Sequence, residues 1–411
     1  MSGYAASPRR DRSQPVSRHG TPPRSRTSSR APSRVQSRRT SPERVDPVVV
    51  LTDSQNFQEL PSTDPLSSLL ARYLPLEDRP VRDLIGDYHG RNVEKLVHDG
   101  SWRALARYAR DTLVSRETTD IRTILELWHI RLHALLRLQL NAQHTRELTT
   151  LDRALAYISR ISPDSRAAIE ENVPFEIEVF RVRAAASAGA YEAVVGLLRK
   201  CQERARAEGE STLWRKRTRR VSGVLIGLLL EHKQYTTALG LLDSLCAETS
   251  TPESDTGALH AFVVRFLIHL ALGTTHEAAT ALHVLEKSGI PEQTKRVLKG
   301  LLLTCQGRDA DVLAKPGEQG TDDGIADIVV ANNEAVAMLD TGELGRAVDT
   351  LRQGMESHQP DSFLEPYIFN MATLAELDSG SAVKRKVEIL SRAAAATASG
   401  EVIKPAAFKL A

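Results

Sequence analysis

The residue pair best spaced for chemistry is His129 and His133, which stand four positions apart. On a helix this spacing places both imidazoles on one face, where they could share a metal ion. A complete site needs further ligands, and no Glu-rich segment lies beside the pair to provide them. We therefore interpret both residues as ordinary helix histidines and predict no metal and no cofactor.

Motifs that would assemble a catalytic centre are missing from the sequence. It contains no Gly-x-Ser-x-Gly nucleophile elbow, no Gly-x-x-x-x-Gly-Lys phosphate loop and no Gly-x-Gly-x-x-Gly dinucleotide loop. Cys201, Cys246 and Cys305 form no Cys-x-x-Cys pair and fit neither a disulfide framework nor a zinc module. These absences predict a protein of a reducing compartment that is not an enzyme.

A run of cations at residues 214–220 is the first candidate binding feature. It opens a predicted helix whose continuation is apolar, so the cations oppose the helix dipole. The simpler interpretation is a solvated start of the helix, and the alternative is a docking patch for an acidic partner surface. The candidate residues are Trp214, Arg215, Lys216, Arg217, Arg219 and Arg220.

The elements that must position these residues are helices. From about Gly90 onward, apolar residues return every three or four positions, and turn residues recur about every fifteen. Four turns share one pattern, in which a Gly or polar turn precedes a bulky residue and then a small one. This is the inter-helix turn of a tetratricopeptide repeat, and it occurs at residues 189–195, 233–239, 273–279 and 342–348.

The spacing of these turns is irregular, and the longest gap leaves room for one extra hairpin at residues 291–314. A weaker version of the pattern at residues 100–105 indicates an earlier turn. Aromatic residues make up only 5% of the chain, which favours stacked helices packed by aliphatic side chains. The prediction is an all-α, tetratricopeptide-like helical-hairpin solenoid over residues 90–411, with polar loops at 247–257 and 307–324.

Two segments precede the predicted solenoid. Residues 48–89 carry short apolar clusters broken by prolines, which predicts an irregular or helical segment for docking or capping. Residues 1–47 are rich in Ser, Arg and Pro and have almost nothing to bury, so we predict a disordered basic tail. Candidate acceptors for proline-directed phosphorylation in that tail are Ser7, Thr21 and Ser41.

Charge is distributed unevenly between the tail and the rest of the chain. Residues 1–46 hold eleven Arg and three acidic residues, a formal charge of +8, so the other residues must carry −6 to give the net +2. A mildly acidic body gives no reason to expect nucleic-acid binding. The longest apolar stretches are too short or too polar to span a bilayer, so we expect no transmembrane segment.

The C-terminal third resembles a known family. Residues 331–336 (ANNEAV), 342–344 (GEL), 365–376 (EPYIFNMATLAE) and 408–411 (FKLA) are similar to subunit 12 of the trafficking protein particle (TRAPP) complex. Upstream, residues 127–132 (LWHIRL), 173–175 (VPF) and 213–217 (LWRKR) match in the same order. The resemblance covers about residues 90–411 and adds Phe369 and Asn370, within a matching segment, as candidate partner-binding residues.

The resemblance implies a non-catalytic scaffold subunit of TRAPP III, a vesicle-tethering and Rab exchange assembly of ER-to-Golgi transport and autophagy. It implies contacts with other TRAPP III subunits, an indirect link to a Rab GTPase, and a cytoplasmic location peripheral to ER-Golgi intermediate or Golgi membranes. It does not indicate which subunit is contacted, or by which face.

Two other functions stay open at this stage. An RNA-associated adaptor would bind through the Arg/Ser tail, and its affinity would fall with salt. A chaperone-binding tetratricopeptide cofactor would clamp a terminal carboxylate with polar groove residues, for which Asn332 and Asn333 are the candidates. That clamp also needs Lys or Arg in the same groove, and Ala331, Glu334 and Ala335 do not supply them.

Overall fold

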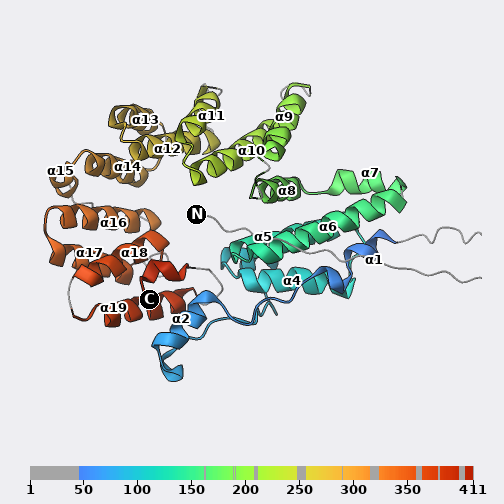
Figure 1. Cartoon of the computed structure of the whole chain (residues 1–411), viewed down its shortest axis with the longest axis horizontal. Helices are drawn as coiled ribbons and strands as arrows, with labels where there is room; N and C mark the ends of the chain where they lie inside the picture. Colours follow the sequence, from blue (N-terminus) through green and yellow to red (C-terminus); the bar gives the residue numbers. More distant parts are fainter. Residues whose placement is uncertain are drawn as a thin grey trace, which may run out of the picture. The chain divides into compact units, whose positions relative to one another are not determined.

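The computed structural model describes residues 46–161, 163–187, 189, 191–207, 212–247, 256–288, 290–314, 324–357, 363–377, 380–397 and 403–410 (Figure 1). All of them belong to one compact unit, Arg44–Ala411. Every regular element in this part of the chain is a helix, which confirms the predicted all-α class. Much of the two predicted polar loops falls outside the described residues.

The N-terminal half begins with short pieces and continues with long helices. The short pieces are α1 (Pro47–Leu51), α2 (Pro65–Tyr73) and α3 (Val93–His98), with 3₁₀ turns at Ser54–Asn56 and Leu76–Asp78. The longer helices are α4 (Trp102–Ser115), α5 (Ile121–Arg137), α6 (Asn141–Ile161), α7 (Pro163–Asn172), α8 (Phe175–Ser187), α9 (Glu192–Ala207) and α10 (Thr212–Glu231).

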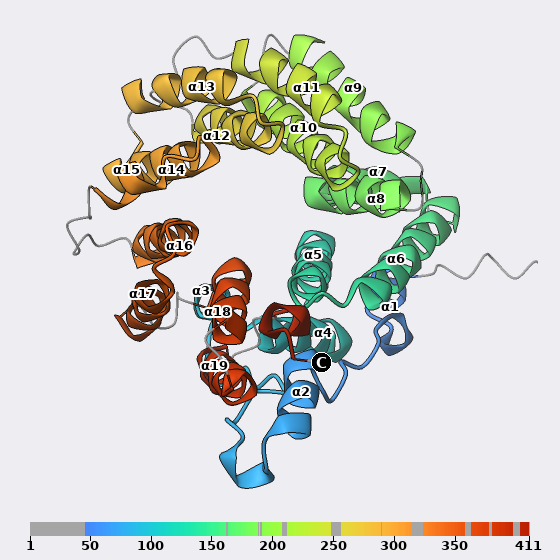
Figure 2. The same ribbon diagram turned by 60° about the vertical axis from the view of Figure 1, so that its left-hand side comes forward.

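The C-terminal half continues the series of hairpins. Its helices are α11 (Tyr235–Ala247), α12 (Thr256–Ala271), α13 (Thr275–Lys287), α14 (Glu292–Cys305), α15 (Asp309–Leu313), α16 (Gly324–Asp340), α17 (Leu344–Ser357), α18 (Glu365–Leu377) and α19 (Ala382–Ala396), followed by a 3₁₀ turn at Pro405–Phe408. Figure 2 shows α10, α12 and α14 in one layer and α9, α11 and α13 in a second layer beside it. Successive hairpins therefore stack in two layers, as predicted for a helical-hairpin solenoid.

The predicted inter-helix turns are present, and they share one mechanism. Gly189, Lys233, Gly273 and Gly342 all have positive φ, between 58° and 95°, at the point where one helix ends and the next begins. Beyond Gly273, the N–H of Thr274 donates to the carbonyl of His269 at 2.9 Å, which closes a Schellman cap. The left-handed residue thus ends one helix and directs the chain back along it.

In three of the four turns, the small residue does what the pattern predicted. Ala238, Ala278 and Ala347 are fully buried where the second helix meets the first. A larger side chain at these positions would force the helices apart. The weaker turn at residues 100–105 and the extra hairpin at 291–314 are also present, the latter as α14 and α15.

Residues 52–92 form a segment that we call the strap, and its first part is tied to α5 and α6. Arg131 and Glu147 form a fully buried ion pair, with Nη2 2.8 Å from Oε1 and Nε 3.0 Å from Oε2. Arg131 also donates to the carbonyl of Gln58 at 2.7 Å, and the N–H of Gln58 donates to Glu147 at 3.0 Å. The strap therefore completes the hydrogen bonding of a buried charge pair.

The second part of the strap is tied to the last helices. Leu66 and Leu70 of α2 belong to the same buried cluster as Leu390 of α19 and Phe408, and Figure 2 shows α2 next to α19. The buried Arg82 pairs with Asp64 at 2.8 Å and donates to the carbonyl of Ala394 at 2.8 Å. The segment that the sequence left as docking or capping thus contacts helices from both ends of the series.

Removing one partner of the buried pair should destabilise the protein strongly. We expect Glu147→Leu to lower the free energy of unfolding by about 3–5 kcal/mol, because Arg131 is then buried without a counter-charge. The measurement is urea unfolding followed by circular dichroism.

The double variant Arg131→Met, Glu147→Leu is the matched control. It removes both charges, so neither is left buried without a counter-charge, and it should be more stable than Glu147→Leu alone. A single variant as stable as the wild type would contradict the role given to this pair.

Candidate protein-interaction site

The basic run at the start of α10 is partly built into the core. Trp214 is only 8% exposed. The guanidinium groups of Arg217 and Arg204 lie 4.4 and 4.9 Å from its ring centroid. Arg217 also lies 4.8 Å from the ring of Phe175, at the start of α8. These cation–π contacts hold α8, α9 and α10 together, so Trp214 and Arg217 serve packing before any partner binds.

Arg220 is also engaged within the chain. Its Nε and Nη2 atoms lie 3.0 and 2.8 Å from the two carboxylate oxygens of Glu176 on α8. This hydrogen-bonded pair raises the pKa of Arg220 above its ordinary value. Arg219 is half-buried, whereas Arg215 and Lys216 are exposed. The surface offered by the predicted patch is therefore centred on Arg215 and Lys216.

The other predicted residues come together on α16 and α18. Asn370 Nδ2 donates to Asn332 Oδ1 at 2.9 Å and so joins the two helices. Phe369 precedes Asn370 and remains 47% exposed, with Lys409 Nζ 5.3 Å from its ring centroid. An exposed aromatic ring beside half-buried amide groups provides apolar and hydrogen-bonding contacts for a protein segment.

Asn333 is the unusual member of this cluster. Its side chain is 9% exposed, and its Nδ2 group is buried without a hydrogen-bond partner. A methyl group added at Gly300 of α14 would stand 4.0 Å from that nitrogen. A buried donor with no acceptor lowers the free energy of unfolding by about 1–3 kcal/mol, and Asn333 should destabilise the unbound chain by an amount of this size.

The charge beside this cluster bears on the carboxylate-clamp alternative. Arg296 of α14 lies 3.2 Å from Glu334 of α16, and burial raises the pKa of Glu334 despite that cation. Arg296 is thus already matched by a carboxylate of its own chain. A ligand carboxylate would have to compete with Glu334 for it.

His129 and His133 lie among aromatic rings. The ring centroid of His129 is 5.8 Å from that of Phe180, and His133 is 5.7 Å from Trp102. Burial lowers the pKa of both histidines. Across the described ranges, no three His, Cys, Asp or Glu side chains converge in a way that would hold a metal ion.

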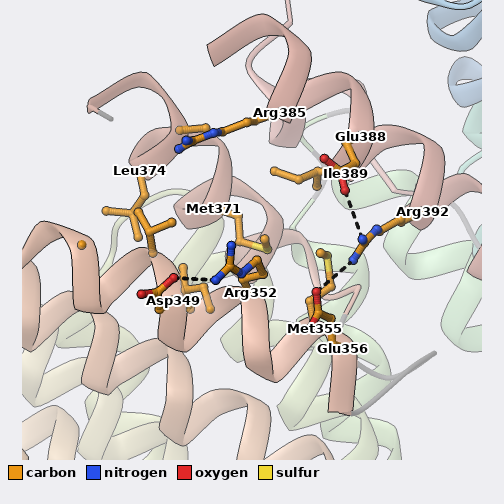
Figure 3. Close-up of a pocket in the computed structure, with 14 residues that line it drawn as sticks. Asp349, Arg352, Met355, Glu356, Met371, Leu374, Arg385, Glu388, Ile389 and Arg392 are labelled. Carbon is orange, nitrogen blue, oxygen red and sulfur yellow. Dashed lines mark hydrogen bonds and ion pairs between the residues drawn. The ribbon is translucent and has the colours of Figure 1, made fainter. Parts of the chain in front are cut away.

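A groove that the sequence reasoning missed lies in the last repeat. It has a volume of about 650 Å³ and is lined by residues of α17, α18 and α19, with Met371 and Leu374 on the α18 side (Figure 3). Arg392 at its rim is paired with Glu388 at 3.0 Å and lies 3.7 Å from Glu356. We call it the C-terminal groove. The apolar stripe of α17 signals a packed helix, but not that part of the stripe stays open.

Several predicted features lie outside the described residues. These include the candidate phosphorylation sites Ser7, Thr21 and Ser41 and the basic tail that carries them. In the part of the chain that the structure covers, no helix is long and apolar enough to cross a membrane.

Comparison with known proteins adds little to these observations. No family model matches the chain, and no curated protein matches it. Among solved structures, it is similar to a tetratricopeptide repeat protein from Parabacteroides merdae, with 13% identity, a TM-score of 0.37, and coverage of 75% of this chain and 96% of that one.

The class of fold therefore rests on the hairpins and turns themselves. The chain is an all-α, tetratricopeptide-like solenoid, a class that typically binds proteins rather than catalysing reactions. The fold suggests a protein-interaction scaffold.

Asn333 provides a test of whether the cluster is built for stability. We expect Asn333→Leu to raise the free energy of unfolding by about 1 kcal/mol, because it removes a buried donor without a partner. Asn332→Leu is the matched control, and it should lower stability by about 1–2 kcal/mol since it leaves Asn370 unpaired. Urea unfolding of both variants measures the difference, and the opposite order would show that Asn333 is a structural residue.

His144 predicts how stability depends on pH. Burial, with Arg183 nearby, lowers its pKa to about 4. The unfolded chain binds this proton near pH 6.5, so the stability linked to His144 is complete above that pH and is lost as pH falls towards 4. The loss amounts to up to about 3 kcal/mol.

The measurement is urea unfolding at a series of pH values between 7 and 4. His144→Leu and His144→Gln cannot take up this proton, so both should flatten the decline. An unchanged slope in both variants would contradict the assignment.

Proposed function

We propose that this chain is a non-catalytic scaffold subunit of a TRAPP III-type vesicle-tethering and Rab exchange assembly. In this role it binds neighbouring TRAPP III subunits and has only an indirect link to the Rab GTPase. It acts in ER-to-Golgi transport and autophagy, in the cytoplasm, peripheral to ER-Golgi intermediate or Golgi membranes.

The observation that carries the proposal is where the family-like segments lie. Residues 127–132, 213–217, 331–336 and 365–376 fall on α5, α10, α16 and α18, which are the first helices of their hairpins. Residues 173–175 lead into α8, and residues 408–410 follow the last hairpin. First helices of stacked hairpins form one continuous surface, which is where solenoids usually bind.

Exposed side chains on these helices support the same view. Arg215 and Lys216 remain exposed on α10, and Phe369 remains exposed on α18. Packing within the chain does not require these side chains to be exposed, whereas binding of a partner does. An acidic surface on a neighbouring subunit would suit the first site, and an apolar or amide-rich segment the second.

The test is affinity purification of the tagged chain from its own cells, with the recovered proteins identified by mass spectrometry. We expect other TRAPP III subunits with the wild type. Arg215→Glu with Lys216→Glu should reduce their recovery about tenfold, equivalent to about 1.4 kcal/mol of binding free energy. Cross-linking of the native complex then locates the face that is bound.

Arg199→Glu with Arg206→Glu is the matched control, since both residues are exposed cations on the second helix, α9. It should leave recovery unchanged. Purification that recovers no TRAPP subunit would overturn the proposal. Recovery of RNA that is lost in high salt would favour an adaptor that binds through the tail.

A further inference from the structure

A polar groove lies between the strap and α6. Residues 55–59 of the strap line one side of it, and residues of α6 from Ala142 to Arg153 line the other. Its volume is about 880 Å³. The charged side chains among its lining residues are Arg146, Arg153 and Glu59. We call this feature the strap groove.

The strap side of this groove is held in place by hydrogen bonds. The carbonyl of Gln58 accepts from Gln143 of α6 at 3.0 Å, and the N–H of Gln58 donates to the buried Glu147 at 3.0 Å. Asn56 Nδ2 donates to the carbonyl of Val50 in α1 at 2.8 Å. The strap groove is therefore formed before a ligand arrives, so little binding free energy is lost in ordering the strap.

The arginines of the strap groove are available to a ligand. Arg146 and Arg153 are exposed, and within the described part of the chain neither forms an ion pair or a side-chain hydrogen bond. Glu59, by contrast, pairs with Arg110, which does not line the groove. The strap groove therefore keeps the positive charge of two arginines that Glu59 does not neutralise.

The spacing of these arginines suits a chain of carboxylates. Arg146 and Arg153 are seven positions apart on α6, so their side chains leave the same face of the helix about 10 Å apart. Acidic side chains on one face of an extended peptide recur at about 7 Å, so residues two or four positions apart lie within reach of both arginines. A guanidinium group binds a carboxylate through two parallel hydrogen bonds, so each arginine suits one acidic side chain.

Two other kinds of ligand fit the strap groove less well. Phe57 is an aromatic lining residue, but it is only 7% exposed and its ring centroid lies 4.6 Å from that of Trp128. An apolar helix would therefore find no aromatic anchor there. Nucleic acids are usually bound by several cations together with rings for base stacking, and the described lining residues include two cations and no exposed ring. The groove therefore favours an acidic protein segment.

We propose that the strap groove binds an extended acidic segment of another protein, in which Asp or Glu side chains on one face pair with Arg146 and Arg153. This site lies on α6 and the strap, apart from the exposed cations of α10. A bound segment contacts both α6 and the strap, so binding should also stabilise the attachment of the strap to α6. The inference does not depend on membership of a tethering complex.

The first test uses a synthetic peptide with the sequence Gly-Ser-Glu-Ser-Glu-Ser-Glu-Ser and a photoreactive group at one end. It is cross-linked to the full-length chain at low ionic strength, below saturation, and the attached residues are identified by mass spectrometry. We expect cross-links to residues 55–59 and 142–153. Because the yield below saturation follows the affinity, Arg146→Gln with Arg153→Gln should reduce it about tenfold at this site.

Arg199→Gln with Arg206→Gln is the matched control. These two arginines are also exposed and seven positions apart, but they lie on α9. This variant should leave the yield at the strap groove unchanged. Substitutions of exposed side chains usually change stability little, so circular dichroism should show that both variants are folded.

The second test is amide hydrogen exchange of the wild-type chain with and without the peptide. Exchange in residues 54–59 should slow when the peptide is bound, because the strap then opens less often. A peptide with Gln in place of each Glu should leave the exchange rates unchanged.

Three outcomes would overturn the proposal. Cross-links confined to residues 1–45 or 214–220 would place the binding of acidic segments elsewhere on the chain. A yield that Arg146→Gln with Arg153→Gln does not lower would show that these arginines do not bind the peptide. Displacement of the peptide from the strap groove by an equal concentration of single-stranded RNA would show that the site prefers nucleic acid. None of these outcomes bears on the scaffold role proposed above.

Discussion

The buried pair of Arg131 and Glu147 is the constraint on which the N-terminal half depends. Both side chains are fully buried, and the Arg131 donors are used by Glu147, Gln58 and the carbonyl of Ala106. Burying two charges costs several kcal/mol per ion unless the geometry and the remaining hydrogen bonds offset it. Gln58 supplies part of that offset from outside α4, α5 and α6. The strap is therefore a structural component of these helices.

The same strap also contacts helices at the other end of the chain. Beyond Gln58, Arg103 donates to the carbonyl of Pro61 at 2.5 Å, and α2 then packs into the cluster around Leu390 and Phe408. Terminal repeats of a solenoid expose apolar faces that need covering. Here one segment covers helices of both the first and the last hairpins. Partners are thus left with the lateral faces of the hairpins and the features that the strap itself displays.

The sequence was sufficient for the hairpins because the signals that specify them are local. Gly273 and Gly342 end their helices in the left-handed conformation, and the small residue that follows lets the next helix pack closely. Both signals lie within a few residues of each other, so they can be recognised in a single sequence. Lys233 adopts the same conformation without being Gly, and only its place in the pattern marked it as a turn.

The long-range contacts could not be predicted in this way. Arg131 lies 73 residues from Gln58 and Arg82 lies 312 residues from Ala394, and no periodicity connects such positions. The prolines of residues 48–89 indicated an irregular segment but not what it contacts. The C-terminal groove was missed for a similar reason. Its lining helices have apolar faces, and the sequence does not show whether such a face is packed or left open.

Arginine shows most clearly why a run of charge in a sequence is not a charged surface. Arg217 and Arg204 cover Trp214, and Arg220 is held by Glu176, so three cations near the start of α10 are used to join helices. In the strap, the buried side chain of Arg82 secures a loop on which Leu76, Val81 and Ile85 are exposed. Long side chains with several donors can bridge elements that small aliphatic residues cannot, and a chain with 5% aromatics relies on such bridges. The surfaces left for partners are then set by which side chains remain exposed, among them Lys216 on α10, Phe369 on α18, and Leu76, Val81 and Ile85 of the strap.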